Sequence, residues 1–510
     1  MKIGASIGFQ LIHIFNIIEN PDLTETEKRQ EIEKYQRSLT NKGEIKNGIP
    51  VKEDKGQNTK EGFYVLGNVD EMDYESLLRT KEYVDNVLTS FTCEGEMKMT
   101  STIAGYDKEN HRIEYNFSFA DEVYGYAMKH GKAMRGHTLV WHKHEPEALD
   151  KYIEDRLGCS LGKFREQYPE EFYQRRKELT KDFLSEYIKT MGEHYPNCYC
   201  WDVLNEIVPD MHTGQPTEQE RKDGIRHSKW MEYLGEEFYI DVLEIARANL
   251  PKGTKLFYNE YGEQHPEKRK AILEVIEKIK QYEQRTGKTI LDGIGLQSHY
   301  DAKMTPEQIE EIHRDFAATG KEIQITEVDI TPGRKDDGIT PEEYNPNNPI
   351  YENLWKKVYE CARKYGIEAL TCWGVNDDLS WFSSLDIGCT MIDKNGVPKE
   401  YAQKFLDEIK REQQREQQIE KIIFFHDQKS DRYYQDMRTG RYSISEQEIG
   451  KATVNIPTTQ KSAAQKHVTR DEQELEQGIT KENWQNENKL IKILKYLLQT
   501  TNIYAKLKPS

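Results

Sequence analysis

The chain has 510 residues, of which 36% are hydrophobic and 10% aromatic, so it can bury a large core. Its formal net charge of −17 argues against a general nucleic-acid binder, because neutralising phosphates requires a basic surface. No stretch is long and apolar enough to predict a membrane span. The composition is compatible with a neutral polysaccharide as substrate.

The N-terminal segment MKIGASIGFQLIHIFNII has one lysine followed by an apolar run, and it could be mistaken for a signal peptide. It lacks a clear small-x-small cleavage site, and Gln10, His13 and Asn16 interrupt the apolar run. We therefore predict a strand at the start of this segment rather than a leader.

Short runs of β-branched or apolar residues predict strands, and most of the segments between them can hold a helix. One such helix is expected to be capped by Thr180 and to carry Leu184, Ile188 and Met191 on one face. The alternation predicts an α/β fold, a closed (β/α)8 barrel. In chain order the predicted strands are Lys2–Phe9, Ser90–Cys93, Ala133–Val140, Cys198–Leu204, Thr254–Tyr258, Gly293–Gln297, Glu322–Thr326 and Ile367–Trp373.

Two regions do not fit a plain barrel. Residues 11–80 form a long charged insertion after the first strand, with helical material such as Glu25–Gln36. Residues 410–510 are rich in Gln, Glu and Lys, which predicts a polar extension that is helical or disordered. Within it, residues 489–498 form an amphipathic patch. The expected domains are a catalytic barrel over 1–409 and an extension of unknown role over 410–510.

Polar and ionisable side chains collect where the predicted strands end. A barrel places its active site at the carboxyl ends of its strands, so these side chains are expected to meet. Glu206 of WDVLNE and Glu327 of QITEVD can then face each other, and two facing carboxylates can break a glycosidic bond. The strand-end residues are Glu94, Lys98, His137, Asn205, Glu206, Asn259, Gln297, His299, Glu327 and Trp373.

Signals for a metal or a disulfide framework are weak. The seven cysteines are an odd number, and four of them fall in predicted buried strands, which favours free thiols. Cys198 and Cys200 have a C-x-C spacing, and His142 and His144 an H-x-H spacing. No third potential metal ligand lies near the two histidines in the sequence at a spacing that metal sites usually have. We expect neither a metal nor a cofactor.

Seven motifs follow one another in the chain, each at a predicted strand end. Together they resemble glycoside hydrolase family 10, the retaining endo-β-1,4-xylanases, over residues 1–10 and 80–408. The resemblance implies a monomeric (β/α)8 barrel that hydrolyses internal β-1,4-xylosidic bonds of xylan or xylo-oligosaccharides by double displacement. The motifs are FTCEGEMK (Phe91–Lys98), RGHTLVWH (Arg135–His142), WDVLNE (Trp201–Glu206), FYNEY (Phe257–Tyr261), DGIGLQSH (Asp292–His299), ITEVDI (Ile325–Ile330) and WGVNDDLSW (Trp373–Trp381).

The resemblance and the chemistry assign the nucleophile to Glu327 and the acid/base to Glu206. A retaining pair needs carboxyl groups about 5–5.5 Å apart. At that separation the charge of Glu327 is expected to raise the pKa of Glu206, and esterification of Glu327 to lower it again. One residue can then act as the acid in the first step and as the base in the second.

The resemblance also implies roles around this pair. Asn205 would bond the sugar 2-hydroxyl, His299 would hydrogen-bond the nucleophile, and Asp329 would orient His299. Tyr261 resembles an aromatic platform on the leaving-group side. The expected contacts to sugar hydroxyls on the non-reducing side are Glu94, Lys98, His137 and Gln297, and the expected aromatic walls are Trp141, Trp373 and Trp381.

Some positions depart from the family pattern. Gly95 replaces an asparagine, Met99 a tryptophan, His144 a glutamine, Glu260 an aspartate and Phe382 an arginine. None of them is one of the two glutamates, and several lie where a second sugar on the non-reducing side would bind. We therefore expect altered affinity and length preference rather than a different reaction.

Two alternatives remain beside a xylanase: a related retaining β-glycanase with another sugar preference, and a barrel that binds carbohydrate without cutting it. The presence of both glutamates argues against the second. The rings of Trp373 and Trp381 are thought to exclude a C6 hydroxymethyl group in this family, so xylose is favoured. Family habit suggests secretion, whereas the free cysteines and the missing signal peptide favour the cytoplasm, so the location stays open.

Overall fold

The computed structural model describes residues 1–41, 45–46, 49–50, 68–331, 349–381, 388–400, 402–407 and 411. The chain divides into two units, Met1–Asp407 and Glu408–Ser510, and nearly all described residues belong to the first. Apart from residue 411, the predicted polar extension lies outside the described residues, and so do its amphipathic patch at 489–498 and Phe382. None of the helices in the described part combines the length and apolarity that crossing a membrane requires.

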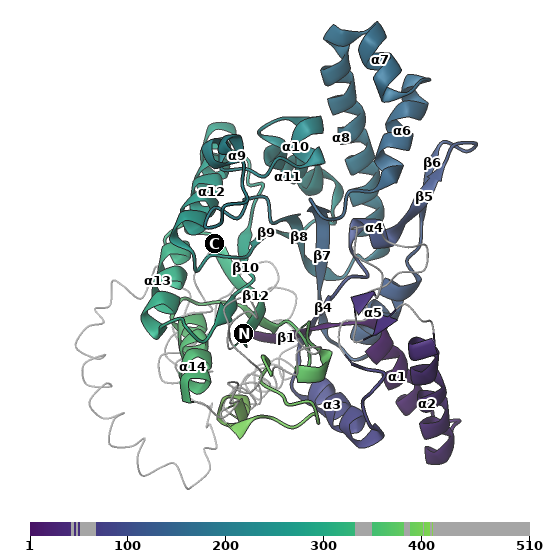
Figure 1. Cartoon of the computed structure of the whole chain (residues 1–510), viewed down its shortest axis with the longest axis vertical. Coiled ribbons are helices and arrows are strands. Elements are labelled where there is room, and N and C mark those ends of the chain that lie inside the picture. Colours follow the sequence, from purple (N-terminus) through teal and green to yellow (C-terminus); the bar gives the residue numbers. More distant parts are fainter. Residues whose placement is uncertain are drawn as a thin grey trace, which may run out of the picture. The chain divides into compact units, whose positions relative to one another are not determined.

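Eight parallel strands close into a barrel, which confirms the predicted fold class (Figure 1). Neighbours follow the chain order from the first strand to the sixth, β10 pairs with β12, and β13 pairs back onto β1. All eight predicted strands are present: β1 (Lys2–Ile7), β4 (Ser90–Cys93), β7 (Ala133–Trp141), β8 (Cys198–Asn205), β9 (Lys255–Glu260), β10 (Gly293–Leu296), β12 (Glu322–Thr331) and β13 (Ala369–Cys372).

The strand β12 is longer than predicted because it has an additional partner. The short strand β11 (His299–Asp301) pairs with its last three residues, Asp329–Thr331. These backbone hydrogen bonds extend β12 past Glu327 and place His299 directly beside Asp329. The extra pairing therefore brings together two residues that the sequence predicted to cooperate.

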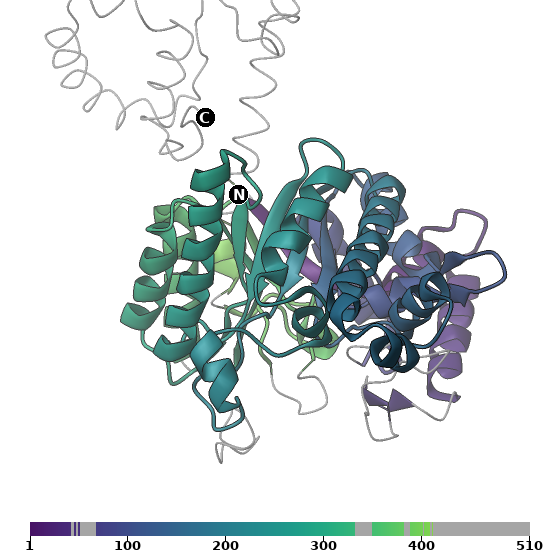
Figure 2. The ribbon, with the colours of Figure 1, turned by 90° about the horizontal axis from the view of Figure 1, so that it is seen from above.

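Helices surround the strands, as the view from above shows (Figure 2). The longer ones are α1 (Phe9–Glu19), α2 (Glu25–Asn41), α3 (Tyr74–Asn86), α5 (Ser118–Lys129), α6 (Glu147–Leu157), α8 (Pro169–His194), α11 (Phe238–Asn249), α12 (Pro266–Thr286), α13 (Pro306–Ala317) and α14 (Pro349–Lys364). Short elements complete the described part: α4 (Met99–Thr102), α7 (Leu161–Gln167), α9 (Glu218–Asp223), α10 (Lys229–Leu234), the 3-10 helix η3 (Asp377–Leu379) and the strand pairs β2 (Ile45–Lys46)–β3 (Ile49–Pro50) and β5 (Ile103–Asp107)–β6 (Arg112–Tyr115).

The helix α8 corrects the prediction of a cap at Thr180. The helix begins at Pro169, where a fixed φ and a missing N–H are tolerated, so Thr180 lies in its interior. The Thr180 hydroxyl donates to the carbonyl oxygen of Arg176 at 2.8 Å. The predicted face of Leu184, Ile188 and Met191 is fully buried, as expected.

Most of the described part of the insertion after β1 is helical, as its sequence indicated. The helix α1 starts at Phe9, directly after the first strand, and buries Leu11, Ile12, Ile14 and Phe15. Apolar residues at this spacing form one face that packs into the core. The helix α2 contains the predicted helical stretch, and α3 leads into β4.

Candidate active site

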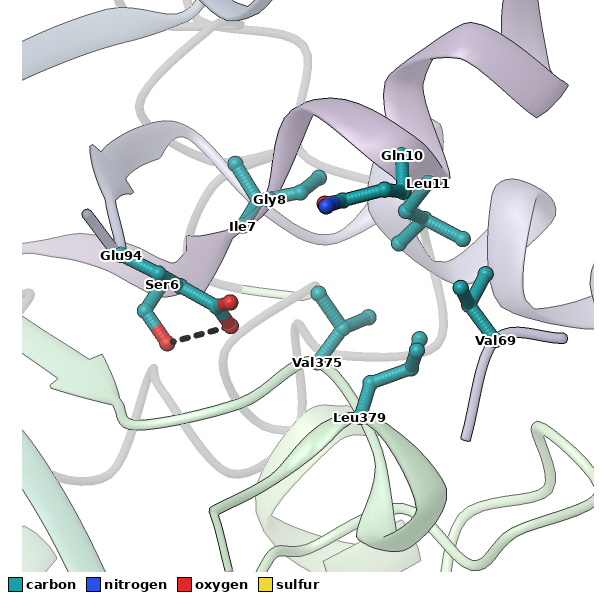
Figure 3. Close-up of a pocket in the computed structure, with 9 residues that line it drawn as sticks. All are labelled: Ser6, Ile7, Gly8, Gln10, Leu11, Val69, Glu94, Val375 and Leu379. Carbon is teal, nitrogen blue, oxygen red and sulfur yellow. Dashed lines mark hydrogen bonds between the residues drawn. The ribbon is translucent and has the colours of Figure 1, made fainter. Parts of the chain in front are cut away.

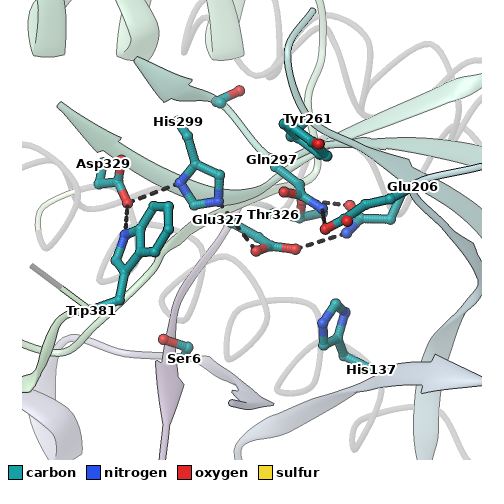
Figure 4. Close-up of polar contacts among 12 residues, drawn as sticks. Ser6, His137, Glu206, Tyr261, Gln297, His299, Thr326, Glu327, Asp329 and Trp381 are labelled. Carbon is teal, nitrogen blue, oxygen red and sulfur yellow. Dashed lines mark hydrogen bonds and ion pairs between the residues drawn. The ribbon is translucent and has the colours of Figure 1, made fainter. Parts of the chain in front are cut away.

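The carboxyl ends of β8, β9, β10 and β12 meet, as the barrel predicts. Glu206 directly follows β8, Gln297 directly follows β10, and Glu327 lies within β12. The carboxylates of Glu206 and Glu327 point into the same space (Figure 4). Their side chains are only 8% and 6% exposed, so neighbouring groups determine their charge state and orientation.

Glu327 is held by an amide and an imidazole. Its Oε1 accepts a hydrogen bond from Asn259 Nδ2 at 2.8 Å, and its Oε2 lies 3.4 Å from His299 Nε2. His299 Nδ1 lies 2.9 Å from Asp329 Oδ2, to which Trp381 Nε1 donates at 2.7 Å (Figure 4). The chain of contacts predicted from Asp329 through His299 to Glu327 is therefore present.

The imidazole of His299 carries a positive charge at neutral pH. Burial alone would lower its pKa, but the charge and hydrogen bond of Asp329, followed by those of Glu327, outweigh burial and raise the pKa to about 10. The imidazolium lies between two carboxylates and compensates their negative charge. This arrangement fixes Glu327 in one orientation.

Asn259 is a site residue for which the sequence suggested no role. It is fully buried, its Nδ2 donates to both Glu327 and Asn205 Oδ1 at 2.8 Å, and its Oδ1 accepts from Thr326 at 2.7 Å. One amide thus links the nucleophile candidate to the residue expected to bond the sugar 2-hydroxyl. The sequence feature that could have indicated a role for Asn259 is its position at a predicted strand end, within the motif FYNEY.

Glu206 is held on both carboxylate oxygens. Trp141 Nε1 donates to Oε2 at 2.8 Å, Gln297 Nε2 donates to Oε1 at 3.2 Å, and Lys143 Nζ lies 3.7 Å from Oε2. The backbone of Glu206 has φ +56°, a left-handed conformation that non-glycine residues rarely adopt. Such strain concentrates at functional sites, where the surrounding structure over-determines it.

The expectation that the pKa of Glu206 is raised is wrong. Burial does raise it, but the charges of Lys143 and His142, the bond from Gln297 and the charge of Lys268 together lower the pKa to about 2. His142 contributes only in acid, because burial lowers its own pKa to about 4. The prediction considered only the charge of Glu327, whereas Lys143 and Lys268, which the fold places near Glu206, lower its pKa.

Of the residues expected to contact sugar on the non-reducing side, Glu94 and Lys98 follow β4, His137 lies on β7 and Gln297 follows β10. Glu94 is buried, Ser6 Oγ donates to its Oε1 at 3.4 Å, and burial raises its pKa well above the usual value. His137 Nδ1 lies 2.9 Å from the buried Asp202. Lys98 Nζ lies 4.8 Å from the centre of the Trp141 ring, and burial lowers the pKa of Lys98.

A small pocket adjoins Glu94 (Figure 3). Polar groups of Ser6 and Gln10 face it together with Glu94, while Leu11, Val69 and Leu379 supply apolar walls. Val69 comes from the end of the insertion, so the segment between the first two barrel strands contributes to this side of the site.

The aromatic residues occupy different depths. Trp373 is buried, and its ring centre lies 5.5 Å from that of His137. Trp381 is 41% exposed, with its ring centre 4.9 Å from that of His299. Tyr261 is partly buried. The sugar contacts that the resemblance implies for these rings stay predictions.

The departures from the family pattern have distinct surroundings. A Cβ on Gly95 would meet no atom within 4 Å, so this position is open. The ring of His144 stacks on Trp141 with centres 4.9 Å apart, and its Nδ1 contacts Thr100 Oγ1. Met99 is fully buried. His144 therefore braces the indole that holds Glu206.

The weak metal signals do not combine into a ligand group. All seven cysteines are free, which confirms the prediction of thiols. Among the described residues, one group of three side chains could hold a metal ion: Glu19, Asp85 and His130. Its two carboxylates already pair with Lys81. The H-x-H and C-x-C pairs belong to no such group in that part of the chain.

The motifs and geometry agree with the comparison to known proteins. The model for glycosyl hydrolase family 10 matches residues 56–408. The chain belongs to glycosyl hydrolase family 10. The family match starts inside the region predicted as an insertion, which lies between β1 and the other barrel strands.

Relatives of this family 10 chain include named xylanases. It is 33% identical over 306 residues to endo-1,4-beta-xylanase A of Thermotoga maritima, covering 59% of this chain and 25% of that protein. It is 32% identical over 273 residues to a beta-1,4-xylanase of Dictyoglomus thermophilum, covering 52% and 67%. A solved endo-1,4-beta-xylanase from Caldicellulosiruptor owensensis is 29% identical with a TM-score of 0.51, covering 64% of this chain and 91% of that one. The match thus spans a quarter of the Thermotoga xylanase.

Proposed function

We propose that the protein is a retaining endo-β-1,4-xylanase that cleaves internal β-1,4-xylosidic bonds of xylan or xylo-oligosaccharides. The observation that carries this proposal is a pair of buried strand-end glutamates with unlike partners. Glu327 is held by Asn259 and the imidazolium of His299, whereas Glu206 is held by Trp141, Gln297 and Lys143. Unlike surroundings for two carboxylates are the usual basis for dividing nucleophile and acid/base roles.

In the first step, a carboxylate oxygen of Glu327 attacks the anomeric carbon while Glu206 gives its proton to the departing glycosidic oxygen. In the second step, Glu206 takes a proton from water, and the water oxygen displaces Glu327 from the anomeric carbon. A low pKa keeps Glu206 deprotonated, as the second step requires. To act as the acid it must be protonated, so we expect sugar on the leaving-group side to separate Lys143, which is 57% exposed, from its carboxylate.

Single substitutions test the two roles. Glu327→Ala should abolish hydrolysis of both xylan and nitrophenyl xylobioside, because no nucleophile remains. Glu206→Ala should abolish xylan hydrolysis but still release nitrophenolate in a first burst, because this leaving group needs no proton. Glu193→Ala, at a glutamate that is 69% exposed on α8, is the control. Full activity of either site variant on xylan would refute the assignment.

A second candidate function is a related retaining β-glycanase with another sugar preference. The open space at Gly95 supports it, because a bulkier or substituted sugar can occupy room that an asparagine would fill. Product analysis on xylan, xylo-oligosaccharides and carboxymethyl-cellulose separates the two. Products from cellulose with none from xylan would favour this second function.

We further propose that the catalytic unit comprises residues 1–409, that residues 410–510 form an extension of unassigned role, and that the protein acts as a monomer. The division of the chain at Asp407 supports the first two statements. Light scattering of the full chain would test the third.

A further inference from the structure

A fully buried pair of opposite charges lies beside Tyr261, the residue expected on the leaving-group side of the site. Lys268 on α12 and Glu260 at the end of β9 are both 0% exposed, with Nζ and Oε2 3.5 Å apart. The hydration free energy lost when two charges are buried usually exceeds the free energy gained from their attraction. Glu260 is also one of the departures from the family pattern. Such a pair is expected to have a purpose beyond stability.

The lysine end of the pair holds Tyr261. Lys268 Nζ lies 3.3 Å from the centre of the Tyr261 ring, where a cation is attracted to the ring face. Nζ also donates to Asp210 Oδ1 at 3.1 Å, and the Tyr261 hydroxyl donates to the same oxygen. The ring is therefore anchored both at its face and at its hydroxyl.

The backbone next to Tyr261 packs on the stem of the same lysine. Gly262 has φ +76°, and a Cβ built there would come within 3.0 Å of Lys268 Cδ. A glycine is needed at this position because it tolerates positive φ and allows the close approach.

The glutamate end of the pair holds two chain segments at once. Glu260 Oε1 accepts from the backbone N–H of Val208 at 2.7 Å and from the Tyr258 hydroxyl at 2.8 Å. Its Oε2 accepts from the backbone N–H of Tyr261 at 3.2 Å. Together with Lys268, every one of these partners is a donor, which is the pattern that a carboxylate anion requires.

Val208 connects the pair to the acid/base, since it lies two residues after Glu206. Arg226 strengthens this link: its Nε donates to the carbonyl of Glu206 at 3.3 Å and its Nη2 to the carbonyl of Val208 at 3.2 Å. One carboxylate therefore joins the segment that carries Glu206 to the segment that carries Tyr261.

We propose that Lys268 and Glu260 are positioning residues that set the Tyr261 ring in a fixed relation to Glu206, so that the sugar leaving the site presents its oxygen to the acid. The proposal rests on the proposed function. We assign the pair to the leaving-group half of the site because Lys268 contacts the Tyr261 ring and Glu260 contacts the segment after Glu206.

The test uses two substrates that differ in their need for this half of the site. Xylotetraose places sugar on Tyr261 and needs the acid, whereas nitrophenyl xylobioside has a leaving group that needs neither. The variant Lys268→Met/Glu260→Gln removes both charges together, so no lone charge is left between the pair. The control Lys321→Met/Glu283→Gln removes a pair that is 12% and 13% exposed, at the opposite end of the strands.

The site variant is expected to lose at least about tenfold in kcat/KM on xylotetraose and less than about threefold on the nitrophenyl substrate. Lys268→Arg should recover part of the loss because it keeps the charge. The control pair should lower the melting temperature without changing the ratio between substrates. Equal losses on both substrates, or no loss on xylotetraose, would overturn the inference. A wild-type protein that cleaves neither substrate would overturn the proposed function as well.

Discussion

Replacing Lys143 with methionine should raise the pKa of Glu206. The ammonium lies 3.7 Å from the carboxylate, and the two side chains are 57% and 8% exposed. At this distance an effective dielectric constant between about 80 and 20 gives an attraction of about 1 to 4 kcal/mol. Because the lysine is more than half exposed, water screens the pair and about 1 kcal/mol is the appropriate figure. This energy corresponds to about 0.7 pKa unit.

The assay is the pH dependence of kcat/KM on xylotetraose. The first step requires Glu206 to carry its proton, so on the alkaline side of its pKa the rate follows the protonated fraction. A pKa higher by about 0.7 unit increases kcat/KM about fivefold at any fixed pH in that range. The nitrophenyl substrate should show no such gain, because its leaving group departs without a proton.

A matched control separates this effect from a general change in surface charge. Lys151 on α6 is also 57% exposed, and its Nζ lies 3.5 Å from Glu147. Lys151→Met should leave the pH profile of the wild type unchanged. If the alkaline limb of Lys143→Met stays in place or moves to lower pH, the explanation for the low pKa of Glu206 is incorrect.

Other substitutions probe the remaining parts of the site. Asn259→Ala removes three hydrogen bonds to buried partners, Asn205, Glu327 and Thr326. It should lower the free energy of unfolding by about 1–3 kcal/mol and kcat at least about tenfold, as denaturant unfolding and kinetics would show. An unchanged kcat would contradict its role beside Glu327. The pKa of His299 is raised to about 10, so its protonated imidazole stabilises the fold. The difference in free energy of unfolding between the wild type and His299→Asn should be complete below about pH 6.5 and disappear as the pH rises through about 10. Denaturant unfolding at a series of pH values would measure it. A difference that grows with pH would contradict this sign. Gly95→Asn should change stability by less than about 0.5 kcal/mol and lower KM for longer xylo-oligosaccharides, whereas a marked loss of stability would show that the position is not open.

The sequence alone predicted the barrel and its two glutamates. Strands of a parallel barrel are buried on both faces, so each appears as a short apolar run, and the residue that follows the run marks the active face. These local patterns were sufficient to predict the positions of all eight strands and to single out Glu206 and Glu327. They failed for Thr180, where a proline eleven residues earlier starts the helix, and for the end of β12, where β11 supplies a partner that no local pattern indicates.

Only the tertiary structure determined how the two glutamates differ. The pKa of Glu206 depends on Lys143 and Lys268, which come from separate segments and act through space. The bridging amide of Asn259 and the buried pair of Lys268 and Glu260 likewise join segments that only folding brings together. Residue type at a strand end specifies which groups reach the site, but the charge on each group depends on distances of a few ångströms between strands. Those distances are set by packing of the whole barrel, not by any local pattern.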